Sequence, residues 1–242
     1  MPKKAEQPAK RLNAIAEDVR VHLDAKHAAR ERGLALCRDA LRHSANAIRA
    51  VHRADFAAAE DLLAQAKSLL EQAAKALTDH RDVFYAGFVH NAQKEFAEGC
   101  LTLALVAGRP LPSPADLGVD HPAYLNGLGE AVGELRRHLL DSLRAGDIGR
   151  CESILAAMDD IYAVMVTMDY PEAITGGLRH TTDAVRGTLE RTRGDLTIAL
   201  VQRNLERRLE EFQGKLPRGE GGWIVKRSGL TTIRRLTLGL FA

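Results

Sequence analysis

A long run of helical periodicity near the N-terminus constrains the fold more than any other feature of the sequence. Residues from about 8 to 53 are predicted to form one helix. Apolar or small side chains recur along its second half at alternating steps of three and four, the spacing of a seam that packs against a neighbouring helix. The seam consists of Leu34, Cys37, Leu41, Ser44, Ile48 and Val51. A chain that begins in this way needs further helices to cover the seam.

The composition agrees with an all-α protein. Aromatic residues make up only 5% of the 242 residues, whereas strands usually collect aromatic and β-branched side chains. The three cysteines have neither metal nor redox spacing, and we expect them to be buried in a reducing compartment. The N-terminus lacks the apolar core of a secretory signal, and no apolar run approaches the roughly 18 to 20 residues that span a bilayer. We therefore expect a soluble, cytoplasmic protein with no membrane partner.

The rest of the chain has the pattern of further helices separated by short breaks. Asp55 and Asp147 are placed to cap two of them, and Pro122 is suited to the first turn of another. The predicted helices after the first are 56–77, 82–107, 122–146, 148–167 and a last one that ends near residue 212. We predict a single all-α domain over 20–213, with a basic extension at 1–19 and a basic tail at 214–242.

Two pairs of glutamates lie on neighbouring predicted helices. Glu95 and Glu98 are three residues apart, and Glu130 and Glu134 are four apart, so each pair shares one face of its helix. Small residues beside both pairs, including Gly127, would let the two backbones approach closely. Because a loop of modest length joins these helices, we expect them to pack antiparallel and to bring the two pairs together.

Four carboxylates gathered in one place would repel one another unless a cation neutralised them. A hard divalent cation with oxygen ligands, Mg²⁺ or Mn²⁺, meets this need. Such an ion can acidify a bound water and neutralise charge on a phosphate. The alternative is an ordinary solvated helix face, paired with Lys94, Arg136 and Arg137, and spacing alone does not exclude it.

A row of arginines runs along the first predicted helix beside the seam. Steps of four, seven and four keep its members on one side of the helix, where they could neutralise a phosphate backbone. The members are Arg38, Arg42, Arg49 and Arg53. Here too the alternative is a solvated face, with Glu31 and Asp39 as ion-pair partners.

Several longer strings carry a family resemblance. They are "RERGLALCRDALRHSANAIRAVHR" (30–53), "QKEFAEG" (93–99), "YLNGLGEAVGELRR" (124–137), "AGDI" (145–148) and "DYPEAITGGLRHTTDAVRGTLERTRGDLT" (169–197). In this order, over about residues 20–210, the chain resembles the translin family. It is more similar to the branch of translin-associated factor X, whose nuclease-competent members carry Glu-x-x-Glu on one helix and an acid pair four apart on the next.

The resemblance implies both a fold and an activity. The implied fold is an all-α bundle of about seven helices that assembles into a hollow homo-oligomer, an octamer in this family, around nucleic acid. The implied activity is that of a Mg²⁺-dependent endoribonuclease on single-stranded RNA. Glu95, Glu98 and Glu134 match the acids of the family, whereas Glu130 stands where the eukaryotic nuclease subunit has Asp. The arginine row would then hold the RNA backbone.

Two other functions remain open at this point. The first is a translin-type protein that binds single-stranded RNA or DNA without cleaving it. The second is a helical scaffold that binds no nucleic acid. The complete set of four acids favours the nuclease, because the binding branch of the family does not keep the set.

Overall fold

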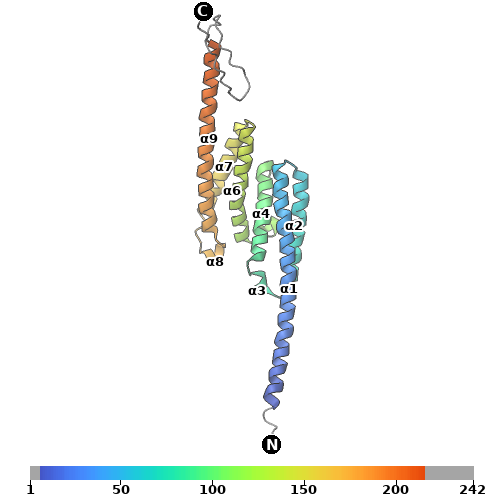
Figure 1. Ribbon diagram of the computed structural model, residues 1–242. Coiled ribbons are helices and arrows are strands. Elements are labelled where there is room, and N and C mark those ends of the chain that lie inside the picture. The colour runs from blue at the N-terminus through green and yellow to red at the C-terminus, as the bar shows by residue number, and fades with distance from the viewer. Residues whose placement is uncertain (1–5, 216–242) are drawn as a thin grey trace, which may run out of the picture. The chain divides into compact units, whose positions relative to one another are not determined.

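The computed structural model describes residues 6–215, and all regular secondary structure in this range is helical (Figure 1). The long helices are α1 (Glu6–His52), α2 (Phe56–Ala76), α4 (Phe88–Ala107), α6 (His121–Arg144), α7 (Ile148–Met165) and α9 (Leu178–Lys215). Three helices of a single turn, α3 (Arg81–Phe84), α5 (Pro114–Leu117) and α8 (Glu172–Thr175), lie in the connections. The predicted all-α fold is confirmed, with six long helices and three short ones between residues 6 and 215.

Three features of the structure can be compared with the predicted domain boundaries. Helix α1 begins at Glu6, inside the predicted extension 1–19. Contacts divide the chain into compact units between Ala199 and Leu200, a point within α9. The predicted tail 214–242 lies outside the described residues, except for its first two positions, which continue α9. No helix in the described range has both the length and the apolarity needed to cross a membrane.

Both predicted aspartate caps are confirmed. An Oδ1 atom of Asp55 accepts a hydrogen bond from the backbone N–H of Ala58 at 3.2 Å, and Asp147 Oδ1 accepts one from Arg150 at 3.0 Å. Each bond satisfies a backbone donor that the first helical turn leaves without a partner. The caps therefore determine where α2 and α7 begin.

The single helix predicted over 82–107 is wrong at residues 85–87. The structure has the short helix α3, a break, and then α4. Gly87 lies in the break with a φ of 98°, a left-handed conformation that glycine adopts without steric cost. The glycine lets the chain turn before α4 begins, so Asp82 belongs to a different element from the glutamates.

The seam of α1 is covered by α2 and α4, as expected. Cys37, Ser44, Ile48 and Val51 are buried, and α1 packs against both of the other helices. One core cluster combines Cys37 with residues of α2 and α4, among them Ala73 and Ala92. The other side of α4 packs against α6, which in turn contacts α7.

Helices α4 and α6 run in the same direction, so the expected antiparallel packing is wrong. The start of α6 lies beside the start of α4, where the N–H of Asp120 donates to Gln93 Oε1 at 3.4 Å. Farther along both helices, Lys94 of α4 contacts Glu130 of α6. The connection 108–120 can return along α4 because an extended chain of its length spans about 43 Å, against about 30 Å for the helix.

Candidate metal site

The site lies where α4 and α6 approach most closely. A Cβ atom on Gly127 of α6 would lie 2.6 Å from the backbone oxygen of Lys94 and 2.9 Å from the backbone nitrogen of Glu98. Real Cβ atoms do not come so close to backbone atoms, so only glycine fits at this position. The predicted close approach at Gly127 is confirmed, and it places the acidic side chains of two helices next to each other.

Three of the four predicted acids come together across this contact. Glu95 and Glu98 of α4 and Glu130 of α6 each direct a carboxylate oxygen into one space, and these oxygens all lie within 4.8 Å of one another. Glu98 is buried, with 8% of its surface exposed, and the other two are half-buried. Parallel helices thus bring together the side chains that an antiparallel arrangement was expected to gather.

The electrostatics of the cluster are unfavourable without an added cation. Burial raises the pKa of the Glu98 carboxyl to about 8, and the neighbouring carboxylates of Glu95, Glu130 and Glu134 add to the rise. The pKa of Glu95 is also raised, first by burial and then by Glu130. Burial and the neighbouring carboxylates thus both disfavour the ionised form, and Lys94 offsets only part of the effect.

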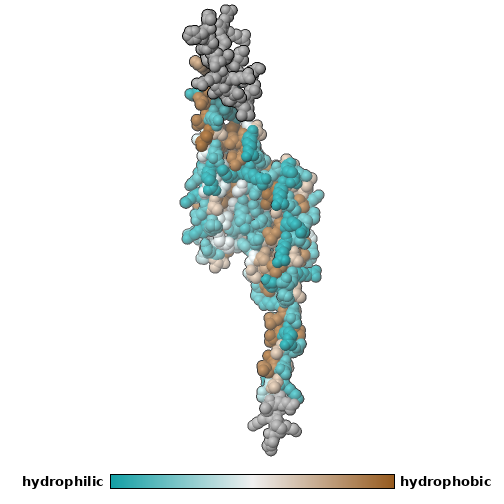
Figure 2. Space-filling view, in the orientation of Figure 1, coloured by the Kyte–Doolittle hydropathy of each residue, from teal (hydrophilic) through white to brown (hydrophobic). Residues whose placement is uncertain are grey.

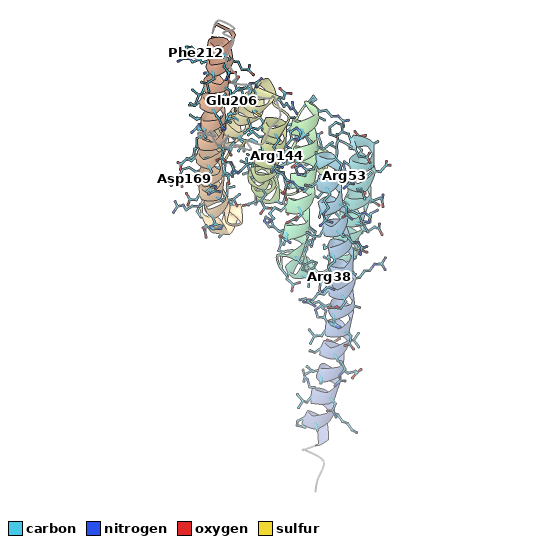
Figure 3. All side chains as sticks on the ribbon, turned by 45° about the horizontal axis from the view of Figure 1, so that its top comes forward. Arg38, Arg53, Arg144, Asp169, Glu206 and Phe212 are labelled. Atoms are coloured by element: carbon cyan, nitrogen blue, oxygen red, sulfur yellow. The ribbon has the colours of Figure 1, made fainter. Side chains whose placement is uncertain are left out.

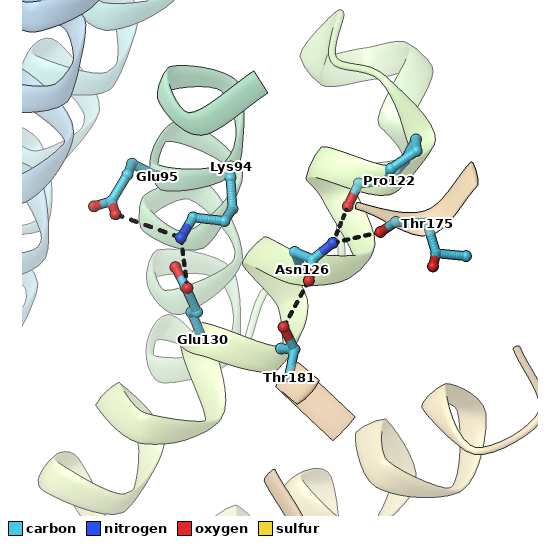
Figure 4. A network of polar contacts seen from close by, with 7 residues as sticks. All are labelled: Lys94, Glu95, Pro122, Asn126, Glu130, Thr175 and Thr181. Atoms are coloured by element: carbon cyan, nitrogen blue, oxygen red, sulfur yellow. Dashed lines mark hydrogen bonds and ion pairs between the residues drawn. The ribbon is translucent and has the colours of Figure 1, made fainter. Parts of the chain in front are cut away.

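One internal cation, Lys94, already lies in the cluster. Its Nζ atom donates to Glu130 Oε1 at 2.6 Å and lies 3.9 Å from Glu95 Oε1 (Figure 4). The lysine acts against the rise in the pKa of Glu98, but it does not cancel it. Lys94 was one of the partners considered for a solvated helix face, and the structure confirms that it pairs with the acids.

The fourth predicted acid, Glu134, lies next to the cluster and has its own partner. Nε2 of His52, at the end of α1, donates to Oε2 of Glu134. This bond is the main reason that the pKa of Glu134 is lowered, and Arg137 contributes to the same effect. The His52 side chain is only 5% exposed. Glu134 is therefore held ionised, and its charge still acts on Glu98.

The arginine row lies on the solvent side of α1. All four members are exposed, and the row lies about 120° around the helix from the buried seam, at about 100° per residue. Arg42 pairs with Asp39 at 3.0 Å, and Arg49 donates to Asn46 at 2.9 Å. Arg38 lies within α1, whereas Arg53 follows the last residue of the helix (Figure 3). No member of the row belongs to the group of three acids.

Sequence reasoning did not assign a role in the site to His52 or Asn126. The amide nitrogen of Asn126 donates to the backbone oxygens of Pro122 and Thr175, each at 2.8 Å. Its amide oxygen accepts a bond from Thr181 at 2.6 Å, which ties α6 to α9 (Figure 4). Apart from the bond to Pro122, these partners lie at least 49 positions away, so no local pattern in the sequence indicates the contacts.

The donor set fits a hard divalent cation. Three carboxylates from two helices supply only oxygen ligands, the type that Mg²⁺ and Mn²⁺ prefer. No cysteine or histidine belongs to the group of three, which disfavours a zinc site of the usual kind. A bound cation would favour the ionised form of Glu98, whose pKa is raised by burial and by three neighbouring carboxylates.

Comparisons with known proteins agree with this architecture. No family model matches the chain. An uncharacterized protein of Methanocaldococcus jannaschii is 26% identical over 193 residues, which cover 79% of this chain and 86% of that one. The structure of the AfC3PO–duplex RNA complex is similar with a TM-score of 0.71 and 35% identity, and the match covers 78% of this chain and 97% of that chain.

Two further solved structures are similar. The crystal structure of AfC3PO alone gives a TM-score of 0.71 and 34% identity over 78% of this chain and 98% of that chain. The apo-NeC3PO structure, at 18% identity and a TM-score of 0.64 over 82% and 98% of the chains, supports the fold alone. The fold is thus the all-α fold of the C3PO structures. The chain belongs to the translin family, as its sequence motifs indicated.

Proposed function

We propose that this protein is a Mg²⁺- or Mn²⁺-dependent endoribonuclease that cleaves single-stranded RNA. The observation that carries the proposal is the convergence of Glu95, Glu98 and Glu130 within 4.8 Å, around a carboxyl whose pKa is raised to about 8. RNA as the ligand is supported by the similar AfC3PO structure, which is a complex with duplex RNA. Single-stranded DNA is a further candidate ligand.

Each residue of the site has a distinct part in this proposal. Glu95, Glu98 and Glu130 would hold the cation. When bound, the ion would supply positive charge to the scissile phosphate and lower the pKa of a water. Glu134 would stay ionised through its hydrogen bond to His52 and so remain able to accept a proton from that water.

Lys94 must leave Glu130 for the carboxylates to accept a divalent ion. Its ammonium group lies 2.6 Å from Glu130 Oε1 and 3.9 Å from Glu95 Oε1, so it occupies carboxylate oxygens that the ion would need. Once displaced, the flexible side chain would lie beside the phosphate and add a positive charge there. The lysine therefore acts as a counter-ion in the metal-free protein.

We propose further that the chain forms a homo-oligomer, an octamer by family resemblance, that encloses the RNA. Support comes from apolar side chains that face solvent in the single chain. On the first half of α1, Leu12, Ile15, Val19 and Leu23 form one row, with Val21 beside it. On α9 the row is Ile198, Val201, Leu205, Leu209 and Phe212. Figure 2 shows these two helical stretches as bands of apolar residues among polar ones. Spacings of three and four along each helix suit packing against another helix.

A non-catalytic RNA-binding protein is the second candidate, and one observation favours it. The ion pair between Lys94 and Glu130 partly neutralises the acids without any metal. A protein that only binds RNA could keep its acids in this state. In that case the arginine row (Arg38, Arg42, Arg49 and Arg53) would still serve to bind the phosphate backbone.

Cleavage assays separate the two candidates. Purified protein is incubated with labelled single-stranded and duplex RNA, in Mg²⁺ and in EDTA, beside the variant Glu98→Ala. The nuclease proposal expects Mg²⁺-dependent cleavage of the single strand that Glu98→Ala abolishes, while RNA binding and assembly stay nearly unchanged. Cleavage that persists in Glu98→Ala would rule out this site. If the unaltered protein binds RNA but does not cleave it, the non-catalytic RNA-binding protein is the remaining candidate.

A further inference from the structure

A second charged feature of α6 lies beyond the acid cluster and has no part in the function proposed so far. It is a groove of about 400 Å³ on the surface of the helix. Its lining residues are Gly133, Arg136, Arg137, Leu140, Asp141 and Arg144. Three arginines against one aspartate give the groove an excess of positive charge. An anionic ligand is therefore favoured.

The groove is continuous with the acid cluster. Glu130, Glu134, Arg137, Asp141 and Arg144 follow one another at steps of four, three, four and three, so they form one stripe along α6. Arg137 lies one turn beyond Glu134 and is close enough to help lower its pKa. Arg144 lies at the end of the helix (Figure 3). A chain that passes the acids along this stripe reaches the arginines next.

One wall of the groove is fixed in place. Arg136 donates to Asp195 Oδ2 at 2.6 Å and to Thr192 Oγ1 at 2.9 Å, and both partners belong to α9. A guanidinium group has five N–H donors, so these two bonds leave others for a ligand. Beside it, no atom of the described residues lies within 4 Å of the Cβ position of Gly133, which leaves this part of the groove open.

Arg137 is the arginine most available to a ligand. It is exposed, and among residues 6–215 it has no ion pair within 4 Å. Arg144 pairs with Asp141 at 3.1 Å, but its side chain is 81% exposed, and such surface pairs are weak and easily exchanged. Guanidinium groups bind phosphate through two parallel hydrogen bonds, which fits a nucleic-acid backbone.

We propose that this groove holds a phosphate of the RNA strand next to the one at the acid cluster, with Arg137 as its principal ligand. The inference rests on the proposed function for the identity of the strand. The groove would bind the RNA backbone, which the acids cannot do without a metal because carboxylates repel a polyanion. The arginines would offset that repulsion and align the strand along α6.

The test measures RNA binding without cleavage. Fluorescence anisotropy of a labelled RNA in EDTA is recorded over a range of salt concentrations for the unaltered protein, Arg137→Gln and Arg137→Lys. We expect Arg137→Gln to weaken binding about tenfold, the typical worth of one charge-assisted hydrogen bond. The slope of log K against log salt should fall by about 1, as for one lost phosphate contact. Arg137→Lys should restore the slope but only part of the affinity.

Arg186→Gln on α9 is the matched control. Arg186 is also exposed, and no ion pair is described for it among residues 6–215. The variant Arg186→Gln should bind RNA with the same affinity as the unaltered protein. Equal losses of RNA affinity in Arg137→Gln and Arg186→Gln, or no loss in either, would overturn the proposal that the groove binds RNA. The nuclease proposal is judged separately, since Glu98→Ala must lose cleavage whether or not Arg137 contributes to binding.

Discussion

Glu98 shows how a single side chain can carry the main energetic cost of a site. It is buried beside three other carboxylates, and Lys94 compensates only part of their charge. In the metal-free protein this carboxyl is protonated at neutral pH, because its pKa lies near 8. A bound cation would favour the ionised form, so metal binding should release a proton from the site.

The raised pKa of Glu98 predicts how stability depends on pH. In the unfolded chain the carboxyl ionises near 4.5, whereas in the folded protein it ionises near 8. Between these values the folded state binds more protons, so the free energy of unfolding falls as pH rises. The loss amounts to a few kcal/mol, because each pH unit between the two pKa values contributes about 1.4 kcal/mol. Urea unfolding in EDTA between about pH 5 and 8 measures it.

Glu98→Gln provides the comparison for this measurement. Glutamine has nearly the same shape and cannot ionise, so the variant should lose much less stability over the same pH range. Parallel pH profiles for the two proteins would contradict the assignment of the raised pKa to Glu98.

Lys94 predicts a change in metal affinity. Because its ammonium group competes with a divalent ion for Glu130, Lys94→Gln should bind Mn²⁺ more tightly. We expect a gain on the order of tenfold, about the worth of one charge-assisted hydrogen bond. Calorimetric titration gives the affinity directly. Lys67→Gln is the control, since Lys67 donates to the backbone oxygen of Asp116, outside the cluster. An unchanged or weaker affinity in Lys94→Gln would show that the lysine does not compete.

At the scale of helices, the sequence predicted which helices form better than it predicted the direction in which neighbouring helices run. Periodicity and the caps at Asp55 and Asp147 predicted the long helices because these signals are local. The direction of α6 beside α4 depends on how the connection 108–120 packs, and loop length alone does not determine that. The break at Gly87 was missed because a glycine within a helical pattern does not reveal its φ.

The same limit applies to the site. The spacing of Glu95, Glu98 and Glu130 predicted which acids share a helix face, and three of them do meet. The pairing of Glu134 with His52 depends on how the end of α1 packs against α6. Tertiary contacts of this kind leave no periodic signal in the sequence.

The close contact between α4 and α6 predicts that adding a methyl group at Gly127 lowers both stability and divalent-ion binding. In Gly127→Ala the new Cβ would meet the backbone of Lys94 and Glu98, so the helices must separate. We expect a loss of about 1–3 kcal/mol in the free energy of unfolding, as for other overpacked sites. Divalent binding should weaken as well, because Glu130 moves away from Glu98. Urea unfolding and calorimetry measure the two effects.

Gly133→Ala on the same helix is a matched control. Apart from the adjoining backbone of α6, no described atom lies within 4 Å of its Cβ position, so the methyl group meets no other element. Alanine is favoured over glycine inside a helix by up to about 1 kcal/mol, and this variant should be as stable as the unaltered protein or more so. Similar losses of unfolding free energy in both variants would show that the contact between α4 and α6 is not the reason that position 127 requires glycine.

At the scale of the whole molecule, the proposed oligomer would bury the exposed apolar faces of α1 and α9. Exposed apolar helix faces of this length are uncommon in proteins that act as single chains. Leu205→Glu should therefore lower the oligomer mass measured by light scattering, because it places a charge on such a face. Arg207→Glu, on the opposite side of the same helix, should leave the mass unchanged. A mass that is unaffected by Leu205→Glu would exclude this face from assembly.

The most direct measurement is the anomalous diffraction of a crystal grown with Mn²⁺. The account predicts one strong peak within coordination distance of Glu95, Glu98 and Glu130, with Lys94 turned away from Glu130. A crystal at saturating Mn²⁺ in which Lys94 still contacts Glu130, with no peak between α4 and α6, would contradict the shared metal site.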